Sequence, residues 1–204
     1  MFIRNEPFKV FLKHYPVTFL ILAVDIAIYL MLLITGTWRI APFFAYQFFQ
    51  YTVGSNAAIL QGAWWELITP VFLHVTFPHI LFNAFSILIF APALETMLGK
   101  WRFLTAFLGT GIASNVADLL LQSSGYSHYG ASAAVFGLLG IYLYLIVFRG
   151  HLVSRPDRII IIVMILVGMI SSFADPNVDV LGHFSGFLSG FVLAPILFIN
   201  APTR

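Results

Sequence analysis

The sequence predicts an all-α, polytopic membrane protein with six transmembrane helices and a long first loop. The chain has 204 residues, of which 60% are hydrophobic and 9% charged, and its mean hydropathy is +0.96. A water-soluble domain of this size needs more polar surface than these residues supply. Apolar stretches near the ~20 residues that a helix needs to cross ~30 Å of hydrocarbon recur along the whole chain. We therefore expect one membrane domain over residues 1–204, surrounded by the lipid bilayer.

The six predicted spans cover residues 17–34, 71–98, 102–121, 131–148, 159–173 and 180–199. The segment 35–70, which joins the first two spans, is rich in phenylalanine, tyrosine and tryptophan. Aromatic side chains favour the interface between membrane and water. This first loop is therefore predicted to lie partly in the outer leaflet, with short helical turns.

Lysine and arginine residues predict the orientation of the spans. With six spans, both termini lie on one side, and nine of the ten basic residues fall there: Arg4, Lys9, Lys13, Lys100, Arg102, Arg149, Arg155, Arg158 and Arg204. Only Arg39 falls on the other side. The positive-inside rule then predicts cytoplasmic termini, and we expect a bacterial plasma membrane. Because the chain has no basic run, its net charge of +2 does not indicate nucleic-acid binding.

Four polar residues lie in the outer thirds of their predicted spans: His79 and Asn83 in the second, Ser132 in the fourth and His183 in the sixth. Seventeen residues, about 26 Å of helix, separate three of them from polar residues at the inner ends of the same spans. These pairs are Asn83 with Lys100, Ser132 with Arg149, and His183 with Asn200. Since polar groups are costly in hydrocarbon, their similar depth predicts a single buried site that opens to the extracytoplasmic side.

Helical geometry predicts which of these side chains share a face. His79 and Asn83 are about 40° apart on a helix, whereas His74 and His79 are about 140° apart, so His74 is expected outside the cluster. Gly186 and Gly190 lie on the same face as His183. The fourth span presents a matching small-residue surface, formed by Gly130, Ala133, Gly137 and Gly140. Close packing of these surfaces would place Ser132 next to His183.

These residue types suit the hydrolysis of an acyl bond. A serine hydroxyl needs a base to take its proton, and the neutral imidazole of His183 can do so. The backbone N–H of Ser132 and the side chains of His79 and Asn83 would bind the oxyanion. Asp175 and Asp179 lie in a loop with no evident route to His183, so we expect a Ser132–His183 dyad. No metal or other cofactor is predicted, and the chain has no cysteine.

Three stretches together resemble the rhomboid family of intramembrane serine proteases. They are HVTFPHILFN at 74–83, GASAAVFG at 130–137 and GHFSGFLSG at 182–190. The resemblance implies that Ser132 is the nucleophile, His183 the base, and His79 and Asn83 the oxyanion donors. It also implies that Glu95 is structural, and that the substrates are single-span membrane proteins with a small residue before the cleaved bond and a helix-destabilising segment beyond it. We expect the substrate to enter laterally, past span 159–173, which contains Gly168.

Two positions differ from the family pattern. The residue after the serine is Ala133, where the family most often has glycine, and this methyl group could narrow the substrate cleft. The first loop contains Trp65-Glu66, where many members have Trp-Arg, so the arginine that would fix this loop in those members is absent here.

Other interpretations remain open at this point. The protein could be a non-catalytic rhomboid-like protein that binds membrane helices, although such proteins usually lack the serine or the histidine. It could also be a small transporter, or a metal or haem carrier that uses His79 and His183, although the histidine spacing does not favour this. Asp25 and Asp118 are expected to make internal hydrogen bonds. The remaining histidines, His14, His128 and His151, are expected to be solvated.

Overall fold

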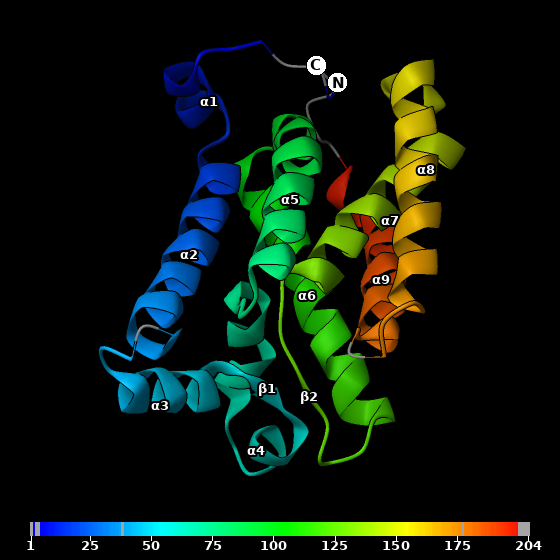
Figure 1. Cartoon of the computed structure of the whole chain (residues 1–204). Helices are drawn as coiled ribbons and strands as arrows, with labels where there is room; N and C mark the ends of the chain where they lie inside the picture. The colour runs from blue at the N-terminus through cyan, green and yellow to red at the C-terminus, as the bar shows by residue number, and fades with distance from the viewer. Residues whose placement is uncertain (1, 3–4, 38, 177, 200–204) are drawn as a thin grey trace.

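The protein folds as a bundle of helices (Figure 1). The computed structural model describes residues 2, 5–37, 39–176 and 178–199, so Arg4, Asn200 and Arg204 lie outside the described residues. Within these ranges the long helices alternate in direction along one axis. They are α2 (Pro16–Leu32), α5 (Phe77–Leu98), α6 (Lys100–Leu121), α7 (Ser132–Phe148), α8 (Arg155–Ser172) and α9 (Val180–Leu197).

Four segments of the described chain are long and apolar enough to cross a membrane: Pro16–Thr37, Phe77–Leu98, Lys100–Leu121 and Val180–Leu197. Helix α7 is apolar but has only 17 residues. Helix α8 has 18 residues, and its first turn carries Arg155, Asp157 and Arg158. The structure thus supports a membrane protein with four candidate spans, and the expected number of six is not confirmed.

The segment between α2 and α5 contains several short elements. They are η1 (Leu33–Thr37), α3 (Pro42–Thr52), β1 (Gly54–Ser55), α4 (Asn56–Leu60), η2 (Trp64–Leu67) and η3 (Thr69–Phe72). Helix α3 lies across one end of the bundle, and α1 (Phe8–His14) lies at the other end (Figure 1). Strand β1 pairs antiparallel with β2 (Ser127–His128), with Gly54 opposite His128. This pairing ties the first loop to the segment that leads into α7.

Glu66 fixes the first loop from within. Its side chain is buried, and its carboxylate accepts a hydrogen bond of 3.0 Å from the backbone N–H of Ser55. The neighbouring Trp65 donates from its indole nitrogen to the carbonyl of Tyr51 and stacks on the Tyr51 ring. At the position where the family often has arginine, this chain thus uses an acid that binds the loop backbone. Burial raises the pKa of Glu66, and the hydrogen bond from Ser55 opposes that rise.

Glu95 links α5 to the start of α2. Its carboxylate accepts hydrogen bonds from the backbone N–H groups of Val17 and Thr18, at 2.9 and 2.8 Å. It also accepts one from the Thr18 hydroxyl at 2.7 Å. Because no side chain caps α2 locally, Glu95 supplies acceptors for the free N–H groups of its first turn.

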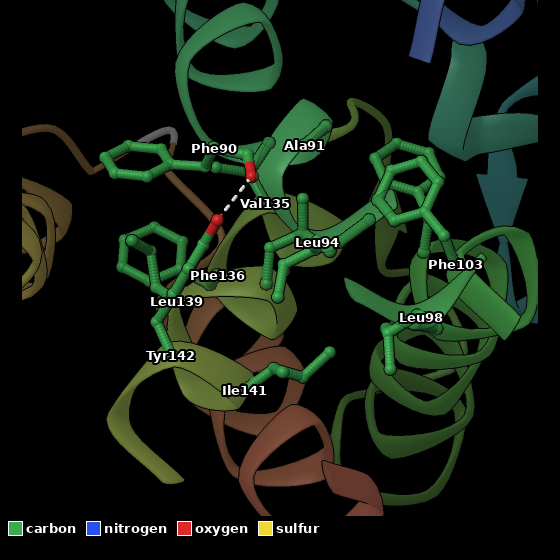
Figure 2. Close-up of a cluster of buried hydrophobic side chains, with 14 of the residues drawn as sticks. Phe90, Ala91, Leu94, Leu98, Phe103, Val135, Phe136, Leu139, Ile141 and Tyr142 are labelled. Atoms are coloured by element: carbon green, nitrogen blue, oxygen red, sulfur yellow. Dashed lines mark hydrogen bonds between the residues drawn. The ribbon is translucent and has the colours of Figure 1, made fainter. Parts of the chain in front are cut away.

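Helix α7 lies at the centre of the bundle. All of its residues from Ala133 to Tyr142 are buried. Figure 2 shows part of this core, in which side chains of α5 and α7 meet and the Tyr142 hydroxyl donates to the carbonyl of Phe90 at 2.7 Å. In hydrocarbon such a bond satisfies a polar group that has no access to water.

Helices α7 and α9 pack backbone against backbone. A Cβ atom added at Gly186 would overlap the carbonyl of Ala133, and one at Gly190 would overlap the carbonyl of Gly137. On the other helix, a Cβ atom at Gly140 would overlap the carbonyl of Phe187. The small residues on these faces therefore set the distance between the two helices, as in other closely packed membrane helices.

We predict that Gly190→Val destabilises the protein strongly, because the valine side chain has to displace the backbone of α7. Overpacking of a tight core typically lowers the free energy of unfolding by about 1–3 kcal/mol. Because the neighbouring atoms at Gly190 belong to the rigid backbone of α7, we expect a loss at the upper end of this range. Thermal unfolding in detergent, followed by intrinsic fluorescence, measures the loss. Gly125→Val is the control, since Gly125 is exposed with open space around it. Equal melting temperatures for both variants would contradict this packing.

We predict that Glu66→Gln stabilises the protein at neutral pH, since glutamine keeps an oxygen for the Ser55 N–H without a buried charge. The folded-state pKa of Glu66 lies above its ordinary value of 4.5. Its contribution to the free energy of unfolding is therefore fully present below pH 4.5 and is lost as the pH rises through the folded pKa. The melting temperature of Glu66→Gln is expected to exceed that of the parent at pH 7.5, with the difference disappearing near pH 4. A less stable variant at pH 7.5 would refute the assignment.

Candidate active site

Ser132 is the first residue of α7. The turn before it needs glycine, because Gly130 has a φ of +121°. The Gly130 N–H donates to the carbonyl of Pro70 at 2.8 Å, which fixes the entry of the chain into the helix. The first N–H groups of an α-helix have no partner within the helix. Ser132 therefore combines a partly exposed hydroxyl with a backbone donor at a helix N-terminus.

His183 lies in the first turn of α9. The Asp179 carboxylate caps this helix by accepting a hydrogen bond of 2.8 Å from the N–H of Gly182. The Ser114 hydroxyl of α6 donates to the Gly182 carbonyl at 3.0 Å. The N-cap of α9 and the neighbouring helix α6 thus hold the backbone that carries the His183 side chain, and that side chain is buried.

The first turns of α7 and α9 meet directly. The ring of Phe136, one turn after Ser132, stacks on the imidazole of His183 at a centroid distance of 4.4 Å and an interplanar angle of 27°. Gly186, one turn after His183, lies against the Ala133 carbonyl. Between the residues that the structure describes, no hydrogen bond joins the Ser132 hydroxyl to His183, so the dyad stays a prediction. Catalytic hydrogen bonds often tighten only when substrate binds.

Helix α5 brings His79 and Asn83 to the same end of the bundle. The Asn83 amide donates to the His79 carbonyl at 2.9 Å, which uses one of its two N–H bonds. The His79 ring lies beside Tyr129, at a centroid distance of 5.8 Å, and faces the backbone of Gly130. The imidazoles of His79 and His183 lie near each other.

His74 belongs to this cluster, contrary to the expectation from helical angles. Its ring centroid is 4.9 Å from that of His79, and its Nε2 accepts a hydrogen bond of 3.4 Å from the N–H of Ala131. Helical angles do not apply to His74, because α5 begins at Phe77 and His74 lies in the non-helical segment before it.

Ser172, at the end of α8, is a further residue of this site that sequence patterns do not reveal. Its hydroxyl oxygen is 2.7 Å from Nδ1 of His183. The only signal in the sequence is the pair Ser171-Ser172 that follows Gly168 on the predicted fifth span, and a serine near a helix end is too common to single out.

Three other polar residues differ from expectation. Both Asp25 oxygens are buried without a hydrogen-bond partner in the described structure. The Asp118 carboxylate has no hydrogen bond of normal geometry within these residues either; it lies beside Asp179 and 3.9 Å from the imidazole of His128.

His128 is buried, not solvated, because the pairing of β1 and β2 places its ring over Gly54. Burial lowers the pKa of His128, and the Asp179 charge opposes that fall. His14 and His151 are exposed.

No group of three or more histidine, aspartate or glutamate side chains within the described ranges is arranged to hold a metal ion. A hollow of about 270 Å³ lies between α2 and the first loop. It is lined by Ile28, Phe48, Thr52, Thr69, Phe72 and Leu73, and therefore by none of the predicted site residues. The opening of the predicted site to the extracytoplasmic side therefore stays a prediction.

A helical membrane protein with a serine at one helix N-terminus, and with histidine and asparagine side chains around it, has the architecture of an intramembrane hydrolase. Residues 61–200 match the Rhomboid domain. The rhomboid-family protein YdcA of Bacillus subtilis (strain 168) is 40% identical over 198 residues, which cover 95% of this chain and 94% of YdcA. The chain belongs to the rhomboid family, and it is a rhomboid-type intramembrane serine protease, a hydrolase of peptide bonds.

Two further relatives are more distant. Rhomboid protease GluP of the same organism is 34% identical over 184 residues, which cover 88% of this chain but 34% of GluP. Rhomboid-like protease 1 of Toxoplasma gondii is 31% identical over 137 residues, covering 65% of this chain and 47% of that protein.

We predict that Gly130→Ala lowers protease activity by at least tenfold, because the new Cβ would come within about 2.5 Å of the His79 ring and displace it. A misplacement of about 1 Å in an active site can cost ~100-fold in rate. Cleavage of a model transmembrane substrate measures the effect. Gly62→Ala is the matched control: Gly62 also has a positive φ, of +107°, but has nothing within 4 Å of the added Cβ. An equal loss in both variants would mean that backbone strain, not His79, is responsible.

Proposed function

We propose that the protein hydrolyses peptide bonds of single-span membrane proteins with Ser132 as nucleophile and His183 as base. The observation that carries this proposal is the stacking of Phe136 on His183 at 4.4 Å. Because Phe136 is one turn along α7 from Ser132, the stack supports an imidazole close to the serine.

The reaction follows acyl-transfer chemistry. His183 takes the proton of the Ser132 hydroxyl through Nε2 while the serine oxygen attacks the carbonyl carbon of the substrate. The imidazolium then gives that proton to the leaving amine as the C–N bond breaks, and the acyl group remains on Ser132. A water molecule, deprotonated by His183, attacks the ester, and Ser132 leaves with a proton returned by the imidazolium.

The oxyanion of each tetrahedral intermediate would be bound by groups from α5 and α7. The Ser132 N–H, at the first position of α7, is not used by the helix itself. Asn83 has one amide N–H beyond its bond to the His79 carbonyl. His79, beside Gly130, would complete the set, so that one charge meets donors from two helices.

We further propose that the chain forms a single domain with six crossings and cytoplasmic termini in a bacterial plasma membrane. The short α7 supports this, since its 17 residues span about 26 Å of a ~30 Å core and leave Ser132 below the outer surface. The inner ends of the helices carry the described basic residues Lys9, Lys13, Lys100, Arg102, Arg149, Arg155 and Arg158, at the end opposite α3 (Figure 1).

In this proposal the substrate enters laterally, past α8, and the first loop lies in the outer leaflet. Helix α8 is at the edge of the bundle (Figure 1), and many of its apolar side chains face outward. A substrate with a small residue before the cleaved bond would fit beside the Ala133 methyl group. The non-catalytic alternative is not favoured, because the chain keeps both Ser132 and His183.

We predict that a fluorophosphonate labels the purified protein at Ser132 and that Ser132→Ala abolishes both labelling and cleavage of a single-span substrate. His183→Ala is expected to lose labelling as well, since the serine then has no base. Ser127→Ala, at an exposed serine just before α7, is the control and should label like the parent. If Ser132→Ala labels as strongly as the parent, the nucleophile assignment is wrong.

A further inference from the structure

We propose that Ser172 of α8 is a positioning residue, whose hydroxyl holds His183 in the tautomer that can act as a base toward Ser132. This inference rests on the proposed function, because it concerns the same imidazole. It adds a third residue, from a third helix, to the pair Ser132 and His183.

The hydrogen-bond pattern assigns the proton. The Ser172 hydroxyl oxygen lies 2.8 Å from the carbonyl oxygen of Gly168 and 2.7 Å from Nδ1 of His183. A carbonyl oxygen can only accept, and a hydroxyl has a single proton to donate. Ser172 therefore donates to Gly168 and accepts from His183, so the imidazole proton is on Nδ1.

This tautomer is the one that the chemistry needs. A neutral imidazole carries one proton, so a proton on Nδ1 leaves the lone pair on Nε2 free. The exposed fractions of Ser172 and His183 are 3% and 9%, which leaves little room for water to replace the serine at Nδ1. Loss of the hydroxyl would thus leave the Nδ1–H group without a hydrogen-bond acceptor. The tautomer with the proton on Nδ1 would then no longer be stabilised over the other one.

The same face of α8 also sets the orientation of the imidazole plane. Gly168, one turn before Ser172, lies against the Phe136 ring, and a Cβ atom there would be 2.8 Å from Phe136 Cζ. Phe136 in turn stacks on His183. The imidazole is therefore held by a ring against its plane and by a hydroxyl at its edge, and both depend on where α8 lies.

No carboxylate takes the place of Ser172. Asp179 is close enough for its charge to act on His183, but its side chain caps α9 by accepting from Gly182. His79 approaches His183 from α5, and its charge is of the wrong sign to stabilise an imidazolium. Among the described groups around His183, Ser172 is the hydrogen-bond partner of its imidazole.

The test compares Ser172→Ala with Ser171→Ala. Ser171 is the matched control, because its hydroxyl donates to the same Gly168 carbonyl at 2.9 Å but is exposed and does not contact His183. For Ser172→Ala we expect kcat on a transmembrane substrate to fall about 3- to 10-fold, the effect of one hydrogen bond, with KM unchanged. Ser172→Thr, which keeps the hydroxyl, is expected to restore most of kcat, and Ser171→Ala to behave like the parent.

Nitrogen-15 NMR of histidine-labelled protein gives a readout that a merely structural role would not move. The parent is expected to show His183 protonated at Nδ1, and Ser172→Ala to show protonation at Nε2. A parent protonated at Nε2, or equal kcat values for the two alanine variants, would overturn the inference. If Ser172→Ala does not fold, the parent spectrum and Ser172→Thr still decide it. Failure of the proposed function would be seen in a different experiment: the fluorophosphonate would still label Ser132→Ala.

Discussion

The close contact between α7 and α9 is the constraint on which the rest of this structure depends. Gly186 and Gly190 let the backbone of α9 lie on the carbonyls of Ala133 and Gly137. Side chains on these faces would separate the helices by the thickness of a methyl group or more. The serine and the histidine stand at the first turns of these helices, so the distance between them follows from residues that take no part in the chemistry.

A second constraint is the cost of polar groups in hydrocarbon. Near the site this cost is met by bonds between elements far apart in sequence, such as Ser114 to the Gly182 carbonyl and the Ala131 N–H to His74. Each bond satisfies a polar group and also fixes one segment of the chain against another. The same requirement that limits polar residues in a membrane therefore provides the precision of the site. Nothing in the structure explains the buried carboxyl of Asp25.

Sequence patterns predicted the parts of the site that obey helical geometry. The small-residue faces with Gly137, Gly186 and Gly190 and the shared face of His79 and Asn83 depend only on the period of a helix, and the structure has them. His74 and His128 were misplaced because the non-helical segment before α5 and the β1–β2 pairing bring them inside. Such tertiary contacts leave no periodic signal in one sequence.

The number of membrane crossings is also harder to predict than the number of apolar stretches. Helix α7 is short, and the first turn of α8 carries charged residues.

The hydrogen bond between Ser172 and His183 suggests why a base in a membrane can work without an acid beside it. A carboxylate at Nδ1 would have to be buried as a charge, at a cost of several kcal/mol unless it is paired. A hydroxyl can fix the same tautomer as a neutral acceptor, and its own proton goes to a backbone carbonyl on the same helix. What a hydroxyl cannot do is stabilise the imidazolium as strongly as a negative charge would. Asp179, which caps α9 by accepting a hydrogen bond from the Gly182 N–H, lies close enough to His183 for its charge to act on the imidazole. In the proposed dyad, orientation would come from Ser172 and charge stabilisation from Asp179, two roles that one aspartate provides in many soluble serine hydrolases.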